Sequence, residues 1–253
     1  YNSLVDQMTI STYQSSRLCK HDIPWQTPVV TERLAAEQLV NKDKYLPIPW
    51  ATIIDWYHHG TSQKRQIAAA EINHLESCSF PQSYTVCQHY KFKFIIPLLK
   101  KIGCTDLYAP HSTETQTDGL RTHAFPLFAP VVPNVIDKRE LLYSFVGTYM
   151  SHYISTIREQ IFNDTHPTNT VIVPRGKWQF NAEVYNEQVT DRSTPVFDTY
   201  LANQNKQYYK RVLQSSRYSL CPSGAGPTSI RIYESLACGA IPIILADTFR
   251  FPR

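Results

Sequence analysis

Long apolar stretches, runs of like charge and a recognisable leader are all missing from this sequence of 253 residues. The net charge is only +4, and lysine and arginine form no tail or stripe of the kind that binds nucleic acid. No apolar stretch reaches the length of a bilayer span, and the first residues lack the basic, apolar and small-residue order of a signal peptide. We therefore expect a chain that binds no nucleic acid, has no membrane segment and is soluble and cytoplasmic.

Paired cysteines are missing as well. The six cysteines are scattered along the chain without a single C-x-x-C pair. This pattern argues against a zinc knuckle and against a redox dithiol. We expect buried free thiols.

Apolar runs and helical patterns alternate along the chain. In the first half, apolar runs predict strands at residues 50–54, 84–87 and 105–109, and helical spacing predicts helices at residues 63–75 and 92–102. In the second half the same reasoning predicts strands at residues 141–147, 170–174, 218–221 and 241–245, and helices at 151–162, 200–215 and 228–238. Such alternation is typical of parallel sheets covered by helices, so the expected fold class is α/β.

A proline-rich stretch interrupts this alternation. Residues 124–137 contain Pro126, Pro130 and Pro133, which break regular structure and suit a crossing between two units. We therefore predict two Rossmann-like halves that face a cleft, formed by residues 1–135 and 136–253.

Glycine is scarce, with eight in the whole chain, yet two of them stand at positions 224 and 226, between a predicted strand and a predicted helix. This loop and the first helical turn are made of small, hydroxyl-bearing and cyclic residues: Ser223, Gly224, Gly226, Pro227, Thr228 and Ser229. Glycines let a ligand approach the backbone, and proline suits a first helical turn. Because free N–H groups and the helix dipole favour anions, this helix start predicts a phosphate or diphosphate site.

One face of the predicted helix carries charge. Arg231 lies one turn beyond Thr228, and Glu234 one turn beyond Arg231, so we expect a polar stripe that points away from the core. Arg231 offers a forked charge for diphosphate oxygens, and Glu234 can accept hydrogen bonds from ribose hydroxyls. The alternative is an ion pair on a solvated helix face. The glycine loop favours the nucleotide interpretation, although neither a full G-x-G-x-x-G nor a Walker loop is present.

The segment from residue 219 to residue 252 resembles the exostosin family of inverting glycosyltransferases. The family pattern is Cys-Pro/Arg, a glycine-rich loop, Ser/Thr-Ser-x-Arg-x-x-Glu-Ala-Leu, Gly-x-Ile-Pro-Val and then an Asp and a Pro. The matching positions here are residues 219–222, Gly224, Gly226, residues 228–231, 234–236 and 239–242, Asp247 and Pro252. Upstream, residues 139–147 are similar to the family's Arg-x-x-Leu-x-x-Phe-x-Gly strand, and residues 106–110 to its Asp-Leu-Phe-x-x-Pro strand.

The resemblance implies a GT-B type fold, with residues 1–135 on the acceptor side and residues 136–253 binding the sugar nucleotide. It also implies a UDP-sugar donor, a glycan acceptor and an inverted, usually β, linkage. The chain stops soon after the Asp-to-Pro segment, so we expect a compact or truncated second half. A short member without an anchor looks most like the transferases of large algal viruses, which makes UDP-xylose the leading donor. If an anchor has been removed, the Golgi lumen is the alternative location.

The leaving diphosphate needs positive groups nearby. Many transferases use Mg or Mn held by an Asp-x-Asp pair, but no two aspartates here stand two residues apart. We therefore expect no metal and no other cofactor, with the helix start and Arg231 stabilising the diphosphate. Arg158 and Arg211 are further candidates for this task.

An inverting transferase also needs a base for the acceptor hydroxyl. Three residues follow predicted strands of the first half and are candidates for it: Asp55, His89 and His111. Asp55 is the first choice, because Trp56 and Tyr57 would screen its carboxylate and raise its pKa. The same two aromatic residues are the candidates for contacting the acceptor.

Two other functions fit the same pattern. A catalytically silent member would only bind glycans or stabilise a partner transferase, whereas a retaining transferase of the same fold would also place a Glu on the nucleotide helix. The sequence leaves the acceptor, the donor sugar and the oligomeric state open.

Overall fold

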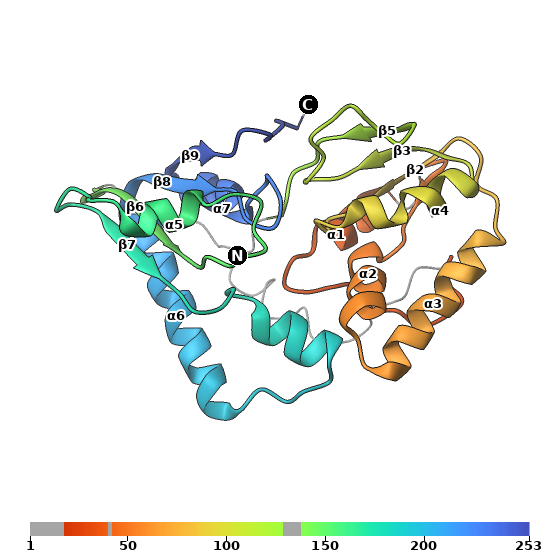
Figure 1. Ribbon diagram of the computed structural model, residues 1–253, viewed down its shortest axis with the longest axis horizontal. Helices are drawn as coiled ribbons and strands as arrows, with labels where there is room; N and C mark the ends of the chain where they lie inside the picture. The colour runs from red at the N-terminus through yellow and green to blue at the C-terminus, as the bar shows by residue number, and fades with distance from the viewer. Residues whose placement is uncertain (1–17, 40–41, 129–137, 253) are drawn as a thin grey trace.

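Two sheets dominated by parallel strands form the framework of the protein in the computed structural model, which describes residues 18–39, 42–128 and 138–252 (Figure 1). The first sheet has the order β1-β2-β3-β5-β4, in which β4 is antiparallel to β5. The second has the order β7-β6-β8-β9 and is parallel throughout. Helices cover both sheets, so the expected α/β fold with two Rossmann-like halves is confirmed.

The first half packs helices on both faces of its sheet. Its strands are β1 (Tyr45–Leu46), β2 (Ser83–Val86), β3 (Cys104–Tyr108), β4 (Gln116–Thr117) and β5 (Leu120–His123). Its helices are α1 (Thr31–Leu39), α2 (Trp50–His59), α3 (Ser62–Glu76), the 3-10 helix η1 (Phe92–Ile95) and α4 (Ile96–Lys101). Leu107 joins the core formed by α2, α3 and α4, whereas its neighbour Tyr108 packs with the cluster that contains α1. Adjacent strand residues point to opposite faces, so the sheet is covered on both.

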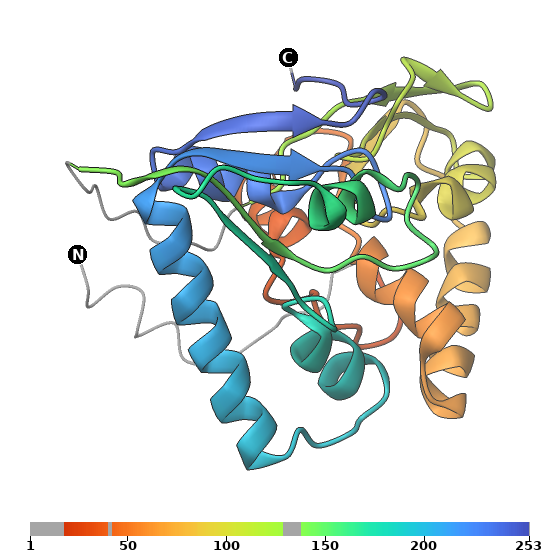
Figure 2. The same ribbon diagram turned by 60° about the vertical axis from the view of Figure 1, so that its left-hand side comes forward.

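The second half repeats this arrangement around a four-stranded sheet. Its strands are β6 (Leu141–Gly147), β7 (Val171–Pro174), β8 (Ser216–Pro222) and β9 (Ile241–Leu245). Its helices are α5 (Ile157–Asn163), the π-helix η2 (Ala182–Val189), α6 (Val196–Ser215) and α7 (Ile230–Ala237). Phe145 packs with α5 and Val146 with α6, so each face again has its own helix. Figure 2 shows α6 as a long helix that leads from the far end of the molecule back to this sheet.

Most predicted elements are present, but the strand predicted at residues 50–54 is wrong. This run begins helix α2, which places Trp50, Ile53 and Ile54 in the core. Their spacing of three and four residues suits a helix face, and a short apolar run does not distinguish a buried strand from a buried helix. All six cysteines are free thiols, as expected, although Cys19 and Cys78 are only partly buried. None of the described helices is long and apolar enough to cross a membrane.

Residues 178–191, which we call the bridging segment, follow β7 in the second half but pack on the first. Phe180, Val184 and Val189 are buried in the same core as α2. The carbonyl oxygen of Gln188 accepts a hydrogen bond from Trp56 Nε1 at 2.8 Å. The predicted boundary between residues 135 and 136 lies outside the described residues. The core of the first half therefore includes residues that lie within the second half of the sequence.

Candidate functional site

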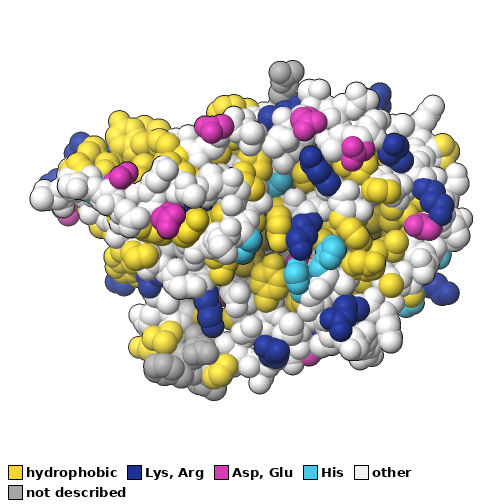
Figure 3. Space-filling model, in the orientation of Figure 1, with side chains coloured by type: hydrophobic (Ala, Val, Ile, Leu, Met, Phe, Trp, Pro, Cys, Tyr) yellow, Lys and Arg dark blue, Asp and Glu magenta, His cyan; other side chains and the backbone are white. Residues whose placement is uncertain are grey.

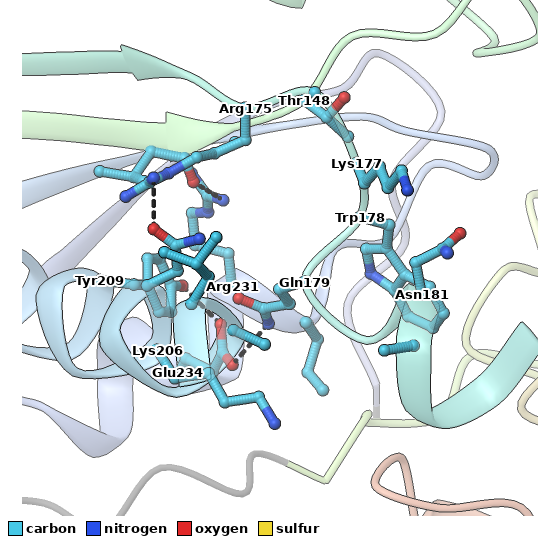
Figure 4. A pocket seen from close by; sticks show the side chains of 18 of the residues that line it. Thr148, Arg175, Lys177, Trp178, Gln179, Asn181, Lys206, Tyr209, Arg231 and Glu234 are labelled. Carbon is cyan, nitrogen blue, oxygen red and sulfur yellow. Dashed lines mark hydrogen bonds between the residues drawn. The ribbon is translucent and has the colours of Figure 1, made fainter. Parts of the chain in front are cut away.

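A cavity of about 310 Å³, which we call the β6–β7 pocket, opens at the carboxyl ends of these two strands (Figure 4). Its walls come from the end of β6, the bridging segment, α6 and the start of α7. The chain moves from β6 to β7 on one side of the sheet and then to β8 on the other, so the strand order reverses at β6. Open α/β sheets bind ligands in the crevice at such a point. The β6–β7 pocket is therefore the candidate site.

Most of the charged side chains that line the pocket are basic. Five carry positive charge, namely Arg158, Arg175, Lys177, Lys206 and Arg231, and one, Glu234, is an acid. Lys206 is already paired with Glu183 of the bridging segment, but the excess of positive charge remains. Such a pocket favours a ligand with more than one negative charge.

Arg231 is buried beside the pocket with part of its guanidinium unsatisfied. The residue is 8% exposed, and its Nη2 donates to the carbonyl oxygen of Val146 at 2.6 Å. The guanidinium carbon lies 4.5 Å from the ring centre of Phe145 and 5.4 Å from that of Tyr209. In the part of the chain that the structure describes, its Nε and Nη1 have no hydrogen-bond partner. A buried donor without an acceptor costs about 1–3 kcal/mol, so these two groups call for an acceptor in the pocket.

Glu234 lies on the same side of the pocket and is 1% exposed. Its carboxylate accepts hydrogen bonds from Tyr209 Oη at 2.5 Å and from Gln179 Nε2 at 3.3 Å, as Figure 4 shows for Gln179. Burial raises the pKa of this carboxyl, against the lowering effect of Tyr209. The expectation that Arg231 and Glu234 point away from the core is wrong, because both side chains are buried between α7 and the pocket wall.

Helix α7 starts at the pocket, two residues later than predicted. Ser229 is its N-cap, and the Ser229 Oγ accepts from the backbone N–H of Arg231 at 3.4 Å. Ser229 also lines the pocket. The hydroxyl of Thr228, in contrast, donates to the carbonyl oxygen of Pro110 in the first half. Of the two hydroxyls expected at a phosphate, the structure places Ser229 at the pocket and Thr228 at the contact between the halves.

The rest of the loop before α7 does not line the pocket. Ser223 Oγ lies 2.7 Å from Ser155 Oγ, and the backbone N–H of Gly224 donates to the carbonyl oxygen of Gly226 at 3.0 Å. A Cβ atom on Gly226 would lie 2.2 Å from Nδ1 of His111, so only glycine fits this position. The glycine at 226 serves close packing between the halves.

Arg158 lines the pocket but is satisfied by backbone groups. It donates to the carbonyl oxygens of Ser223 at 2.7 Å, Thr148 at 3.0 Å and Pro222 at 3.3 Å. Burial, followed by the charge of Arg231, lowers its pKa to about 10, so it stays charged at neutral pH. Arg158 therefore joins the ends of β6 and β8 and adds positive charge to the site.

The remaining predicted arginine, Arg211, is exposed on α6 and does not line the pocket. The structure instead brings in Arg175 and Lys177, which sequence reasoning missed. A signal existed for both, since they directly follow the predicted strand at residues 170–174 and ligands bind beyond the carboxyl ends of such strands. Lys206 lies within a helix and had no such signal.

Asp55 and His89 lie side by side in the first half. Asp55 is part of α2 instead of following a strand, and it is 2% exposed. Its Oδ2 accepts from Gln26 Nε2 at 2.6 Å, and its Oδ1 lies 3.2 Å from His89 Nε2. His89 Nδ1 accepts from the backbone N–H of Lys91 at 3.1 Å, so in the neutral ring the proton is on Nε2 and faces Asp55. Both nitrogens of His89 are thus in use, whereas a carboxylate can accept about four hydrogen bonds.

His111 follows β3 and reaches the loop before α7. Its Nδ1 is buried, faces Gly226 and has no hydrogen-bond partner among the described residues. Burial and the nearby His89 lower its pKa to about 3, so the ring is neutral at physiological pH. The three predicted bases therefore lie near one another, since Asp55 is 3.2 Å from His89 and the charge of His89 acts on His111. His111 alone reaches the loop before α7, and none of the three lines the β6–β7 pocket.

Trp56 and Tyr57 have different surroundings. Trp56 is 6% exposed and bonds to the bridging segment through its Nε1, and the ammonium of Lys64 lies 5.1 Å from its ring centre. Tyr57 is 40% exposed and packs against the ring of Phe94 at 5.0 Å. Trp56 thus anchors the bridging segment, and neither residue lines the β6–β7 pocket.

The loop, α7 and the pocket all lie within a recognised domain. The exostosin GT47 domain matches residues 110–253, more than half of the chain. The chain belongs to the exostosin GT47 family. The match starts at Pro110, whose carbonyl oxygen accepts from Thr228, and so covers the whole second half of this exostosin-family chain.

Several curated plant proteins are similar to this family member. It is 24% identical over 180 residues to a probable glucuronosyltransferase of Oryza sativa subsp. japonica, a match that covers 68% of this chain and 38% of the relative. It is 24% identical over 185 residues to a probable beta-1,4-xylosyltransferase of Arabidopsis thaliana, covering 68% and 39%. A stretch of 53 residues is 42% identical to a probable glucuronoxylan glucuronosyltransferase of Arabidopsis thaliana, covering 21% and 12%. By the two longer matches, the chain spans about two fifths of the length of the curated relatives it matches.

Proposed function

We propose that this protein is an inverting glycosyltransferase that moves a sugar from a UDP-sugar to a hydroxyl of a glycan acceptor and forms a β-linkage. One observation carries the proposal. Arg231 is buried at the β6–β7 pocket with two guanidinium donors that lack an acceptor. A diphosphate supplies oxygens for both, and the excess of basic side chains in the pocket matches its charge. Membership in the exostosin GT47 family supports a nucleotide-sugar donor.

In this proposal different residues of the pocket bind the diphosphate and the ribose of the nucleotide. The diphosphate lies at the start of α7 between Arg231 and Ser229, with Arg175 and Lys177 completing the positive surroundings. Glu234 accepts hydrogen bonds from the ribose hydroxyls, and Gln179 and Tyr209 hold its carboxylate in place. Positive groups at the leaving oxygen stabilise the charge that grows as the glycosidic bond to the diphosphate breaks.

The acceptor oxygen attacks the anomeric carbon from the opposite side, and its proton passes to a base. Asp55 remains our candidate for the base, because its carboxylate has lone pairs beyond those used by Gln26 and His89. His89 has no free nitrogen and acts as a positioning residue for Asp55. His111 is the second candidate, since an anion bound near the loop before α7 would raise its pKa from about 3.

A ligand-binding experiment tests the nucleotide site. UDP at about 100 times its Kd should raise the melting temperature by roughly 5–10 °C. Arg231→Ala should weaken UDP binding by about 10–100-fold, because a charge-assisted pair is lost, whereas Arg65→Ala, an exposed arginine on α3, should leave it unchanged. If neither UDP nor GDP raises the melting temperature, or if Arg231→Ala binds UDP like the parent, the nucleotide site is not in this pocket.

A turnover experiment separates the three functional alternatives. Incubation of the protein and a glycan acceptor with UDP-xylose first, then UDP-glucuronate and UDP-galactose, is run in parallel with EDTA and with Mg²⁺ or Mn²⁺. NMR of the product then reports donor, metal dependence and linkage together. A β-linkage formed in EDTA is the expected result. An α-linkage would assign a retaining transferase, and UDP binding without transfer or donor hydrolysis would assign a silent glycan-binding protein. Asp55→Asn should lower kcat by about 10²–10⁴-fold without weakening UDP binding.

A further inference from the structure

Five side chains beside the pocket form what we call the basic-aromatic rim: His58, His59, Tyr90, Lys91 and Tyr185. They come from the end of α2, the segment after β2, and η2. The Nζ of Lys91 lies 3.3 Å from Nε2 of His59 and 5.7 Å from the ring centre of Tyr90. The ring centres of His59 and Tyr185 are 6.1 Å apart. Figure 3 shows histidine side chains beside a basic side chain near the middle of this face of the molecule.

Among the residues that the structure describes, no acid forms an ion pair with the Lys91 ammonium of the rim. The contacts of the Lys91 ammonium are an imidazole and an aromatic ring. Lys64, by comparison, is paired with Asp191 at 2.6 Å. The carboxylate whose charge acts on both rim histidines is Asp55, which is already bound by Gln26 and His89. The rim therefore offers a cation and two imidazoles to a ligand.

The bridging segment places this rim next to the donor pocket. Within η2, Asn186 lines the β6–β7 pocket while the adjacent Tyr185 contacts His59 of the rim. His89, which lies 3.2 Å from Asp55, stacks on the ring of Tyr90 with 4.7 Å between the ring centres, so the candidate base lies close behind the rim. A molecule on the rim would have one end near the base and near the sugar of a bound donor. An acceptor must occupy such a position.

We propose that the basic-aromatic rim binds a carboxylate-bearing glycan, with a uronate group paired to Lys91 and sugar rings packed on Tyr90 and Tyr185. The identification of this glycan as the acceptor rests on the proposed transferase function, whereas its binding does not. Charge-assisted hydrogen bonds to the uronate supply selectivity for acidic over neutral chains. Aromatic faces edged by polar groups supply area for the sugar rings.

Protonation of the rim is coupled to binding. Burial, followed by the charge of Lys91, lowers the pKa of both His58 and His59, with His89 acting in the same direction and Asp55 in the opposite one. Both imidazoles are therefore neutral near pH 7. A bound carboxylate would favour their charged forms, so the affinity for an acidic glycan should rise as the pH falls below about 7.

Calorimetry on the whole chain with tetragalacturonate and with its methyl ester tests the proposal, since esterification removes the negative charges and adds only a methyl group to each carboxyl. The acid should bind about tenfold more tightly than the ester at low salt, and this preference should shrink as salt is added. Lys91→Gln should remove most of the preference. Lys101→Gln is the matched control, because Lys101 is exposed on α4 and paired with Glu76. The double variant H58Q/H59Q should remove the pH dependence.

Equal binding of acid and ester, binding of neither, or an unchanged preference in Lys91→Gln would each overturn this inference. UDP binding measured on the same samples keeps it separate from the proposed function. A protein that binds UDP but shows no preference between the probes refutes the rim alone. A protein that prefers the acid but does not bind UDP refutes the transferase function alone.

Discussion

Arg158 and Arg231 both line the β6–β7 pocket, and their hydrogen bonds separate their roles. Arg158 donates to three backbone carbonyl oxygens and holds strand ends together. Arg231 donates to one and leaves two buried nitrogens free. A buried arginine whose N–H groups all have acceptors has a structural role in the fold. A buried arginine with N–H groups that lack acceptors indicates a ligand site. At the scale of the residue, the count of unused donors identifies the site better than the sequence motif does.

Glu32 is a buried acid outside the site, and it should make stability depend on pH. Desolvation raises its pKa from 4.5 to about 8, against hydrogen bonds from the backbone N–H groups of Gln88 and Ala51. Because the pKa is higher in the folded protein, the folded state holds an extra proton in this window and loses stability as the pH rises from about 4.5 to about 8. Glu32→Gln should reduce this loss in the free energy of unfolding by on the order of a few kcal/mol. Urea unfolding at several pH values measures it.

The partly exposed Glu76 on α3 is the control for this measurement, and Glu76→Gln should keep the pH dependence of the parent. The amide oxygen of Gln can accept both backbone N–H groups, since both are bound by one oxygen of Glu32, Oε1. If the free energy of unfolding changed with pH in the same way for the parent and for Glu32→Gln, the raised pKa of Glu32 in the folded protein would be contradicted.

At the scale of the element, helix α7 depends on the residues at its two ends. Ser229 caps its start, and Gly239 follows its end with a φ of +72°, a conformation that disfavours side chains. Ser229→Ala and Gly239→Ala should each lower the free energy of unfolding by about 1 kcal/mol, and together by about 2 kcal/mol because the two ends are independent. Urea midpoints at constant m report these changes, with Ser62→Ala, an exposed serine on α3, as the control. A double variant no weaker than either single one would contradict this view of the helix.

Elements whose own residues carry an apolar run or helical spacing together with glycine at the ends could be predicted from the sequence. Strands β6 and β9 have the predicted bounds, and α7 was expected because a glycine loop precedes it and a glycine follows it. Helix α2 was mistaken for a strand, since four of its first five residues are apolar and all five are buried. The bridging segment was missed because its apolar residues pack on a core far away in sequence. For the same reason the motif at α7 predicted Arg231, Glu234 and Ser229 at the site, but not Arg175, Lys177 or Lys206 on the opposite walls.

At the scale of the whole molecule, the first half should not fold without the bridging segment. A fragment of residues 18–128 lacks Phe180, Val184 and Val189, which are buried in its core. Each large apolar side chain contributes about 1.5–3 kcal/mol, and the sum approaches the total stability of an ordinary domain. We expect circular dichroism to show no cooperative melting of the fragment, and a single cooperative transition for residues 18–252.

Adding the missing residues provides the control. A fragment in which a flexible linker joins residue 128 to residues 176–192 should regain cooperative melting, because it restores the three apolar side chains and the bond from Trp56 to Gln188. If residues 18–128 alone melted like the intact chain, the core would not need the segment.

The bridging segment also sets an order of events during synthesis on the ribosome. A nascent chain that has reached Phe128 contains every strand of the first sheet, yet the side chains that close its core are still to be made. At 5–20 residues per second, the stretch from Phe128 to Val189 takes roughly 3–12 s to synthesise. During that interval the apolar surface around α2 is open to the surrounding solution, and chaperones that recognise such surfaces have time to bind it. The growing chain therefore completes its first half only after it has begun the second.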